Sequence, residues 1–191
     1  QTFLQGISQP IMREQARDYF VNQQFRKDLY VRGATRLSST VQRERLLDTR
    51  FVLQQLVDSV KTKVNGAAGE ASLQPEIYGP LLEALAAKNY APKTLRQLVA
   101  AVPAVPYGNL NQALTVLVGM GAVSPCQSEA AEKQVQARCT ALNQHLAQRA
   151  QLENQIEYLA SPVTGGGIPL GRFQQVFLLA LSQGKKQPQH W

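Results

Sequence analysis

The chain has 191 residues, of which 44% are hydrophobic and 17% charged, and its formal net charge at pH 7 is +7. This composition can supply a buried core, which argues against an intrinsically disordered protein. No apolar run approaches the ~20 residues that a membrane-spanning helix needs. The chain begins with Gln1 and shows no basic-then-apolar leader, so we expect a cytoplasmic piece of a longer polypeptide without membrane contact.

The cysteines and histidines are too few for a disulfide framework or a standard metal site. The candidate ligands Cys126, Cys139 and His145 have a spacing that fits no usual zinc pattern. We interpret the two thiols as buried or incidental side chains of a reducing cytoplasm, and we expect no metal.

The positive charge is concentrated at the start of the chain. Residues 1–63 contain eleven Lys or Arg against six Asp or Glu, residues 64–124 three against three, and residues 125–191 six against four. A basic first third can attract nucleic acid, an acidic polypeptide or another domain of the same protein. A solvated surface explains the same pattern.

Residues 1–73 are expected to form a small α+β unit. Apolar side chains recur at helical spacing from Ile11 to Asn22, which predicts an amphipathic helix. Hydroxyl residues begin a short helix over 38–48, where they can cap its first amides. Segments 49–56 and 58–64 are β-rich and could pair, and Asn65-Gly66 indicates a hairpin turn before a third extended piece. The segment "LYVRG" predicts a further strand over 29–33.

Residues 74–191 are expected to form a second, winged-helix-like unit. Three short helices are predicted, followed by a strand over 122–125, which is the order of a winged helix. A long or broken helix over 128–155 would then be an insertion in the wing, and a strand over 156–163 would pair with 122–125. The fold class is therefore α+β and mostly helical. The helices expected in this unit are 75–90, 91–102, 109–120, 128–155 and 168–184.

The glycine-rich segment "SPVTGGGIPLG" resembles a cofactor loop only superficially. Its spacing is GxGxxxG rather than GxGxxG, and no repeated βαβ units surround it. We interpret Gly165, Gly166 and Gly167 as a tight turn between a strand and the last helix. We expect no cofactor and no catalytic residue in this chain. The sequence contains no nucleophile elbow and no P-loop, and the pair Glu153 and Glu157 is expected to be exposed.

Nucleic-acid binding is an alternative that the charge and the winged-helix order both suggest. In a DNA-binding winged helix the third helix reads the DNA. Here that helix, 109–120, contains no Lys or Arg, and phosphate contacts by basic residues dominate DNA affinity. We therefore favour a protein-interaction or scaffolding role for this unit, with a DNA-binding regulator and a dimerisation module as the alternatives.

The order of segments also resembles a known family. "NQQFRKDLYVRG" is similar to the opening of the predicted methyltransferase regulatory domain of bacterial S-adenosylmethionine-dependent methyltransferases, including protein lysine methyltransferases. "PEIYGPLLEALAA", "NLNQALTVLVGMGAVSP", "LNQHL" and "IEYLASPVTGGGIPLGRFQQVFLLAL" resemble the C-terminal winged-helix region of the same proteins. The resemblance runs from about Ile11 to Gly184, and "QFRKDLYVRG" and "LASPVTGGGI" are its most specific parts.

The resemblance implies a regulatory middle domain over 1–73 and a winged-helix-like C-terminal domain over 74–191. It also implies an upstream catalytic domain that holds S-adenosylmethionine. The expected function is that of a non-catalytic region that recognises a protein substrate and contacts the catalytic domain in cis.

Two motifs are candidate partner or substrate surfaces. In "FRKDLYVRG" the charged residues Arg26, Lys27, Asp28 and Arg32 could dock the catalytic domain or hold a protein substrate, or they could simply pair on the surface. In "SPVTGGGIP" the hydroxyls of Ser161 and Thr164 could bind a partner's backbone, although turn formation explains them equally.

Overall fold

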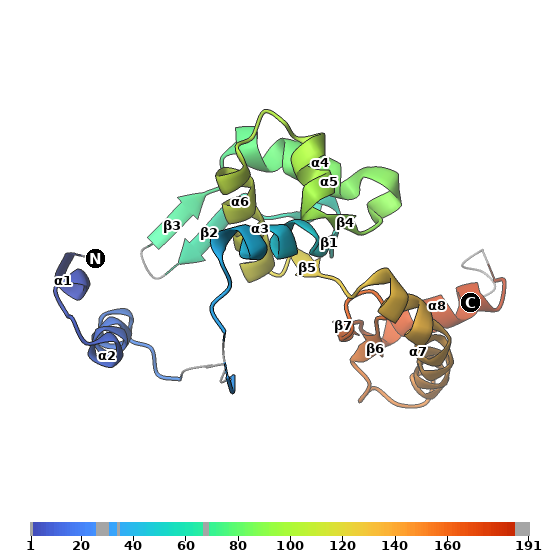
Figure 1. Cartoon of the computed structure of the whole chain (residues 1–191). Coiled ribbons are helices and arrows are strands. Elements are labelled where there is room, and N and C mark those ends of the chain that lie inside the picture. The colour runs from blue at the N-terminus through green and yellow to red at the C-terminus, as the bar shows by residue number, and fades with distance from the viewer. Residues whose placement is uncertain (1, 26–30, 34, 67–68, 186–191) are drawn as a thin grey trace.

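The computed structural model describes residues 2–25, 31–33, 35–66 and 69–185. Within these ranges the chain forms eight α-helices, one 3₁₀ turn and seven short strands, so the expected α+β, mostly helical class is confirmed (Figure 1). In chain order the elements are α1 (Thr2–Gln5), α2 (Pro10–Val21), α3 (Ser39–Leu47), β1 (Arg50–Leu53), η1 (Val57–Ser59), β2 (Lys63–Gly66), β3 (Gly69–Ser72), α4 (Pro75–Tyr90), β4 (Lys93–Thr94), α5 (Leu95–Ala101), α6 (Tyr107–Gly119), β5 (Val123–Pro125), α7 (Glu129–Arg149), β6 (Tyr158–Ala160), β7 (Gly167–Pro169) and α8 (Arg172–Ser182).

A leucine-rich core holds the central unit, residues 39–125, together. Helices α4, α5 and α6 pack on one another and on a three-stranded antiparallel sheet in the order β4-β1-β5. Leu81, Leu95, Leu98, Leu110 and Leu117 have no exposed surface. Removing such side chains from water is the main force that stabilises a unit of this size.

Helix starts in this unit follow their sequence signals. Ser38 caps α3 by accepting a hydrogen bond from the Val41 N–H, and Thr94 forms a capping box with Gln97 at the start of α5. Each cap gives a partner to helix amides that would otherwise lack one. Helix α3 belongs to the same unit, because Arg96 of α5 forms ion pairs of 2.9 Å with Glu44 and Asp48.

The strand pairing differs from the sequence prediction. β1 pairs with β4 and β5, not with the segment 58–64, and β6 pairs with β7, not with 122–125. The predicted hairpin forms from β2 and β3, but Asn65 and Gly66 do not make its turn, because they belong to β2 and pair with Glu70 and Gly69 of β3. Of the predicted strand over 29–33, residues 31–33 have no strand pairing, and 29–30 lie outside the described residues. The local sequence correctly predicted extended backbone at β1, β5 and β6, but it did not predict which strands pair with each other.

The C-terminal part, residues 126–185, has a second and smaller set of buried residues. The predicted long helix is the single helix α7, and α8 packs against it. The side chain of Asn143 on α7 makes two hydrogen bonds to the backbone of Ala160 in β6, of 2.7 and 2.8 Å. Arg172 of α8 donates to the carbonyls of Ala150 and Gln151, just after α7. These polar contacts supplement a core built largely from alanine and leucine: Ala147, Ala150, Leu159, Leu179 and Ala180.

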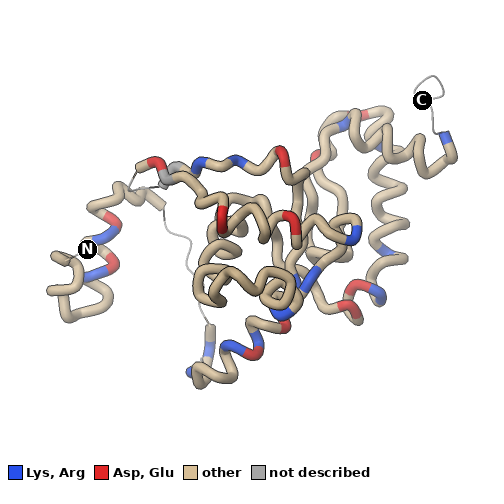
Figure 2. The backbone as a smooth tube through the Cα atoms, turned by 90° about the horizontal axis from the view of Figure 1, so that it is seen from above, with Lys and Arg blue, Asp and Glu red and all other residues tan. Residues whose placement is uncertain are grey.

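The N-terminal helices α1 and α2 stand to one side of the central unit in Figure 1 and contact each other. Basic and acidic positions are interspersed along the chain rather than gathered on one element (Figure 2). The helices formed by the described residues lack the combined length and hydropathy that crossing a membrane would require.

The predicted domain boundary between residues 73 and 74 stays a prediction. The sheet β4-β1-β5 joins residues on both sides of that boundary, because β1 precedes it and β4 and β5 follow it.

Candidate functional site

The predicted residues of the glycine-rich segment form the turn between β6 and β7. Ser161 is buried, and its hydroxyl accepts a hydrogen bond of 3.2 Å from the Thr164 N–H. The backbone closes the same turn, because Ser161 N–H donates to the Gly166 carbonyl at 2.8 Å and Gly165 N–H donates to the Ser161 carbonyl at 2.9 Å. Ser161 therefore uses its hydroxyl within the turn, which is the geometry that the turn interpretation predicts.

Of the three consecutive glycines, Gly165 is the one that a residue with a side chain could not replace without strain. Its φ of +73° lies in the left-handed region, and a Cβ there would lie 1.9 Å from the Gln127 Nε2 atom. Gly167 lies in β7, where a Cβ would meet only the side chain of Tyr158 at 3.4 Å. The turn interpretation is thus correct in kind but wrong in place, since the glycines join two strands and α8 begins only at Arg172.

The surroundings of these glycines do not suit a methyl-donor or dinucleotide loop. Such a loop follows a parallel strand and leaves the glycine face open to the phosphates or the cofactor. Here β6 and β7 are antiparallel, and the Gln127 side chain fills the space beside Gly165.

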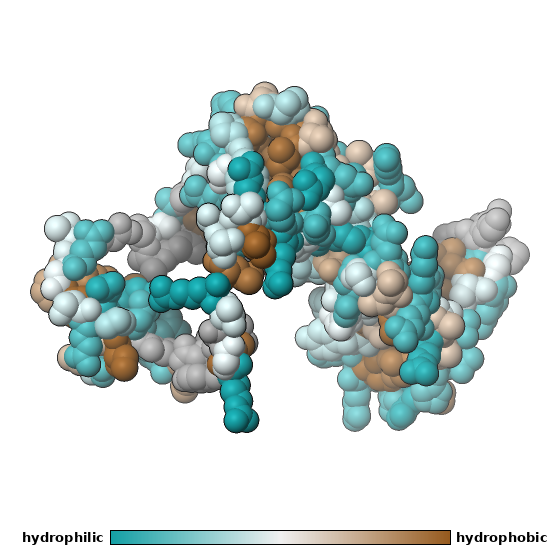
Figure 3. All heavy atoms as spheres, viewed as in Figure 1, coloured by the Kyte–Doolittle hydropathy of each residue, from teal (hydrophilic) through white to brown (hydrophobic). Residues whose placement is uncertain are grey.

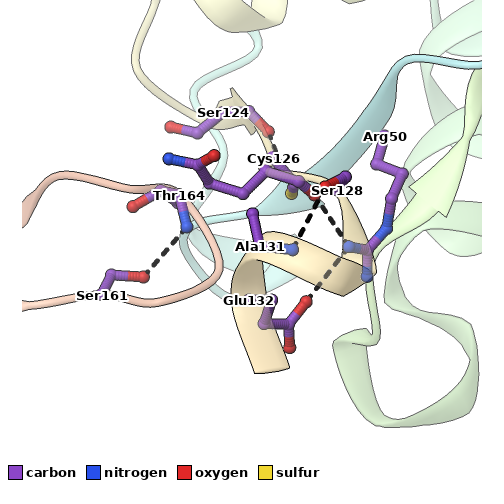
Figure 4. Close-up of polar contacts among 9 residues, drawn as sticks. Arg50, Ser124, Cys126, Ser128, Ala131, Glu132, Ser161 and Thr164 are labelled. Carbon is purple, nitrogen blue, oxygen red and sulfur yellow. Dashed lines mark hydrogen bonds and ion pairs between the residues drawn. The ribbon is translucent and has the colours of Figure 1, made fainter. Parts of the chain in front are cut away.

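The turn meets the central unit at a polar junction, which we define by Arg50, Gln127, Glu132, Val163 and Gly165. The Gln127 N–H donates to the Val163 carbonyl at 2.8 Å, and the Gln127 carbonyl accepts from Arg50 Nη1 at 2.8 Å. The same Arg50 atom forms an ion pair with Glu132 at 3.1 Å. Figure 4 shows Arg50 reaching from β1 to the first turn of α7. One arginine thus joins β1, the link before α7 and α7 itself.

The ion pair of the junction is well shielded from solvent. The side chain of Arg50 is 13% exposed and that of Glu132 is 24% exposed. Coulomb attraction between partly buried charges is stronger and less screened than between charges on the surface. Glu132 also lies in the first turn of α7, where a negative charge interacts favourably with the helix dipole.

Cys126 lies between β5 and the junction and is half-buried. Burial raises the pKa of its thiol to about 11, the nearby Arg50 lowers it and Glu132 raises it. A pKa of about 11 keeps this thiol almost entirely protonated at neutral pH, and the thiolate is the reactive form of cysteine. Its N–H donates to the Arg50 carbonyl at 2.8 Å, which continues the β1–β5 pairing into the junction.

None of the other residues singled out from the sequence that the structure describes belongs to the junction. Arg26, Lys27 and Asp28 lie outside the described residues, and Arg32 is exposed on the link before α3. Glu153 pairs with Arg149 at 2.7 Å, whereas Glu157 is exposed. Within the described ranges, no three His, Cys, Asp or Glu side chains are grouped closely enough to hold a metal ion.

A polar groove of about 260 Å³ lies between the end of β3, the start of α4 and the start of α6. Amide side chains and Tyr78 line it, and burial raises the pKa of the Tyr78 hydroxyl. Helix α6 itself contains no Lys or Arg, so this face lacks the cations that hold a DNA phosphate backbone. The lining residues are Ser72, Gln74, Ile77, Tyr78, Asn109, Gln112 and Ala113.

The junction is a site that sequence reasoning missed. Arg50 and Glu132 are far apart in the sequence, and each occurs in an ordinary polar context. The pattern around Arg50 indicated a strand, and that around Glu132 indicated a helix. A signal for their pairing would have required knowledge that β1 and β5 are neighbours, which no local pattern contains.

Comparisons with known proteins give one match to the start of the chain and one to its whole length. Residues 1–32 match the family described as "Predicted methyltransferase regulatory domain". The whole chain is similar to the uncharacterized protein sll1526 of Synechocystis sp. (strain ATCC 27184 / PCC 6803 / Kazusa), with 34% identity over 191 residues. The alignment covers 99% of this chain but only 37% of that relative. No solved structure matches the chain.

Proposed function

We propose that this chain is the non-catalytic, substrate-recognising and regulatory region of a bacterial S-adenosylmethionine-dependent methyltransferase. The observation that carries the proposal is the match of residues 1–32 to the predicted methyltransferase regulatory domain. The catalytic domain, which would bind the methyl donor, would precede residue 1 in the same cytoplasmic polypeptide. The length of the Synechocystis relative, most of which lies outside the alignment, supports this arrangement.

The central unit fits this role as a winged-helix-like module. Helices α4, α5 and α6 and the antiparallel sheet β4-β1-β5 correspond to the three helices and three strands of a winged helix. Helix α3 and the β2–β3 hairpin are additional, and β1 precedes α4 and takes the central position in the sheet. Its α6 face presents amides and hydroxyls rather than cations. Such a surface suits hydrogen bonds to a protein backbone better than contacts with DNA phosphates.

The junction gives a physical reason why the central unit and the C-terminal part would act together. Arg50 bonds both to Glu132 at the start of α7 and to the carbonyl of Gln127 just before it. This restricts rotation about the short link that follows β5. A substrate held across both parts would therefore meet a preorganised surface, which lowers the entropic cost of binding.

The decisive experiment separates donor binding from substrate recognition. Titration calorimetry with S-adenosylmethionine is carried out on residues 1–191 and on the polypeptide encoded by the complete reading frame. We expect the longer polypeptide to bind the donor and residues 1–191 not to bind it. Binding by residues 1–191 alone with a micromolar dissociation constant would overturn the proposal.

One deletion variant of the longer polypeptide, measured in two ways, tests the recognition role. Deleting residues 39–191 should leave the dissociation constant of the donor unchanged within a fewfold range, because the donor site lies elsewhere. The same deletion should lower kcat/KM for the protein substrate by at least about tenfold, which corresponds to losing one or two good contacts in the transition state. An unchanged kcat/KM would show that residues 39–191 do not recognise the substrate.

A further inference from the structure

The N-terminal helical pair, α1 with α2, buries none of its residues. Phe3, Ile11, Tyr19 and Phe20 are between 66% and 80% exposed. Figure 3 shows apolar surface on this part of the molecule, to the left of the central unit. In the central unit, large apolar side chains are buried in a core. In α1 and α2, large apolar side chains are exposed to solvent.

The pair is nevertheless built as a groove rather than as two loose turns. Arg13 donates two hydrogen bonds, of 2.7 and 2.9 Å, to the Ile7 carbonyl in the link between the helices. The rings of Phe3 and Phe20 meet edge to face with 5.6 Å between their centroids. A groove of about 580 Å³ results. Its lining is mainly apolar: Phe3, Gly6, Ile7, Ser8, Gln9, Met12, Gln15, Ala16 and Tyr19.

The helix α2 is amphipathic, and none of its charged residues lines this groove. Glu14 and Arg17 pair with each other at 3.1 Å and do not line it. A helix of this length is marginal in water unless its apolar face is covered, because little burial offsets the entropy lost on ordering the chain. The pair therefore needs a covering surface.

The comparisons indicate which surface covers it. The match to the regulatory domain ends at residue 32, just beyond these helices. A domain needs a core, and the described residues of 1–32 supply none. The central unit has its own closed core and lies beyond the match. The core of the regulatory domain is therefore expected in polypeptide outside residues 1–191, of which the Synechocystis relative has ample length.

We propose that α1 and α2 are the last helices of the regulatory domain, and not its opening as the resemblance of the sequence implied, and that the preceding part of that domain covers their apolar groove in cis. A domain is normally continuous in sequence, and the chain after residue 32 goes on to form the central unit, so the missing part precedes residue 1. The covering surface would be an apolar helix face, because an apolar groove between two helices accepts the apolar face of an amphipathic helix. This inference rests on one part of the proposed function, namely that residues 1–32 belong to a regulatory domain.

Hydrogen exchange followed by mass spectrometry tests this docking. It is measured on residues 1–191 and on the polypeptide of the complete reading frame at the same concentration. We expect the α2 amides to exchange at least about tenfold more slowly in the longer polypeptide, since covering a helix raises the free energy of its local opening. Equal exchange rates in the two proteins would overturn the proposal, and so would a complete reading frame that adds no residues before residue 1.

A second copy of this chain is the competing occupant. Protection of α2 in residues 1–191 that rises with protein concentration, together with a dimer in light scattering, would overturn docking in cis. A monomer with rapid α2 exchange at every concentration supports it.

Matched variants in the longer polypeptide locate the contact. Met12→Asp places a charge in the groove and should abolish most of the protection of α2. Arg17→Ala changes the charged face and should leave that protection intact. Equal effects of the two variants would contradict the assignment of the groove.

The outcome is separable from that of the proposed function. Protected α2 amides in a polypeptide that binds no S-adenosylmethionine would retain the docking and remove the methyltransferase role. Rapidly exchanging α2 amides in an active methyltransferase would retain the methyltransferase role and overturn the docking.

Discussion

Helices α2 and α8 are both amphipathic, yet they end in different environments. Helix α8 packs against α7 and buries Gln175, Leu179 and Ala180, whereas α2 buries no residue. The C-terminal part is also tied to the central unit through the junction of Arg50, Gln127 and Glu132. Apolar periodicity thus identifies the face that a helix will bury, but a second complementary surface is required before burial occurs.

The largest effect is expected in the core of the C-terminal part. Leu159 is 7% exposed and Phe20 is 69% exposed. Leu159→Ala should lower the free energy of unfolding by about 2–4 kcal/mol, because it leaves a cavity. Phe20→Ala should change it by less than about 0.5 kcal/mol. Urea denaturation followed by circular dichroism measures both, and equal effects would contradict the contrast between the two parts.

The junction should give the next largest effect. Arg50→Met removes two hydrogen-bonded contacts and leaves Glu132 partly buried without this partner. The expected loss in the free energy of unfolding is about 1–3 kcal/mol. Arg96→Met is the control, because Arg96 also has two acidic partners but is exposed, and it should change stability little. Unchanged stability of Arg50→Met would show that the contacts of Arg50 do not stabilise the protein.

The turn of the C-terminal part should give a smaller effect. Gly165→Ala combines a positive φ with displacement of the Gln127 side chain, and the expected cost is about 1–2 kcal/mol. Gly166→Ala is the matched variant, because a Cβ there has no neighbour within 4 Å and its φ is not in the left-handed region. A thermal melt of both variants decides the matter, and equal shifts would remove the special role of Gly165.

The thiol beside the junction should give the smallest effect on stability and a clear effect on reactivity. In a Cys139→Ser variant at pH 8, Cys126 should react with iodoacetamide roughly a hundredfold more slowly than a free cysteine, because its pKa of about 11 leaves little thiolate. Cys126→Ser is the control in which Cys139 reports. Alkylation as fast as in the urea-unfolded protein would contradict burial of the thiol.

The same pKa predicts how stability depends on pH. The folded-state pKa is raised above the ordinary value of 9.0 to about 11, so the folded protein holds this proton more tightly than the unfolded chain does. The stabilising contribution is complete below pH 9 and is lost as the pH rises to 11. The difference in stability between the protein and Cys126→Ser should shrink across that window in urea titrations.

Much of the secondary structure followed from local pattern. The periodicity over 11–22 predicted α2, and the hydroxyl residues that begin 38–48 predicted the cap that Ser38 gives α3. Asn65-Gly66 indicated a hairpin in the right region, but both residues belong to β2 and do not make its turn. The pairing of β1 could not be predicted in the same way. Its partners are β4 and β5, and the choice among several short extended segments depends on which of them the packed helices bring together.

The sequence by itself determined which segments are helical and which faces are apolar, because these depend on side-chain spacing and on the conformational preferences of single residues. Only the tertiary structure decided that Arg50 meets Glu132, that Gln127 occupies the space beside Gly165 and that the apolar face of α2 stays uncovered. Each of these depends on contacts between segments far apart in the chain, and such contacts are selected by the burial and packing of the whole molecule.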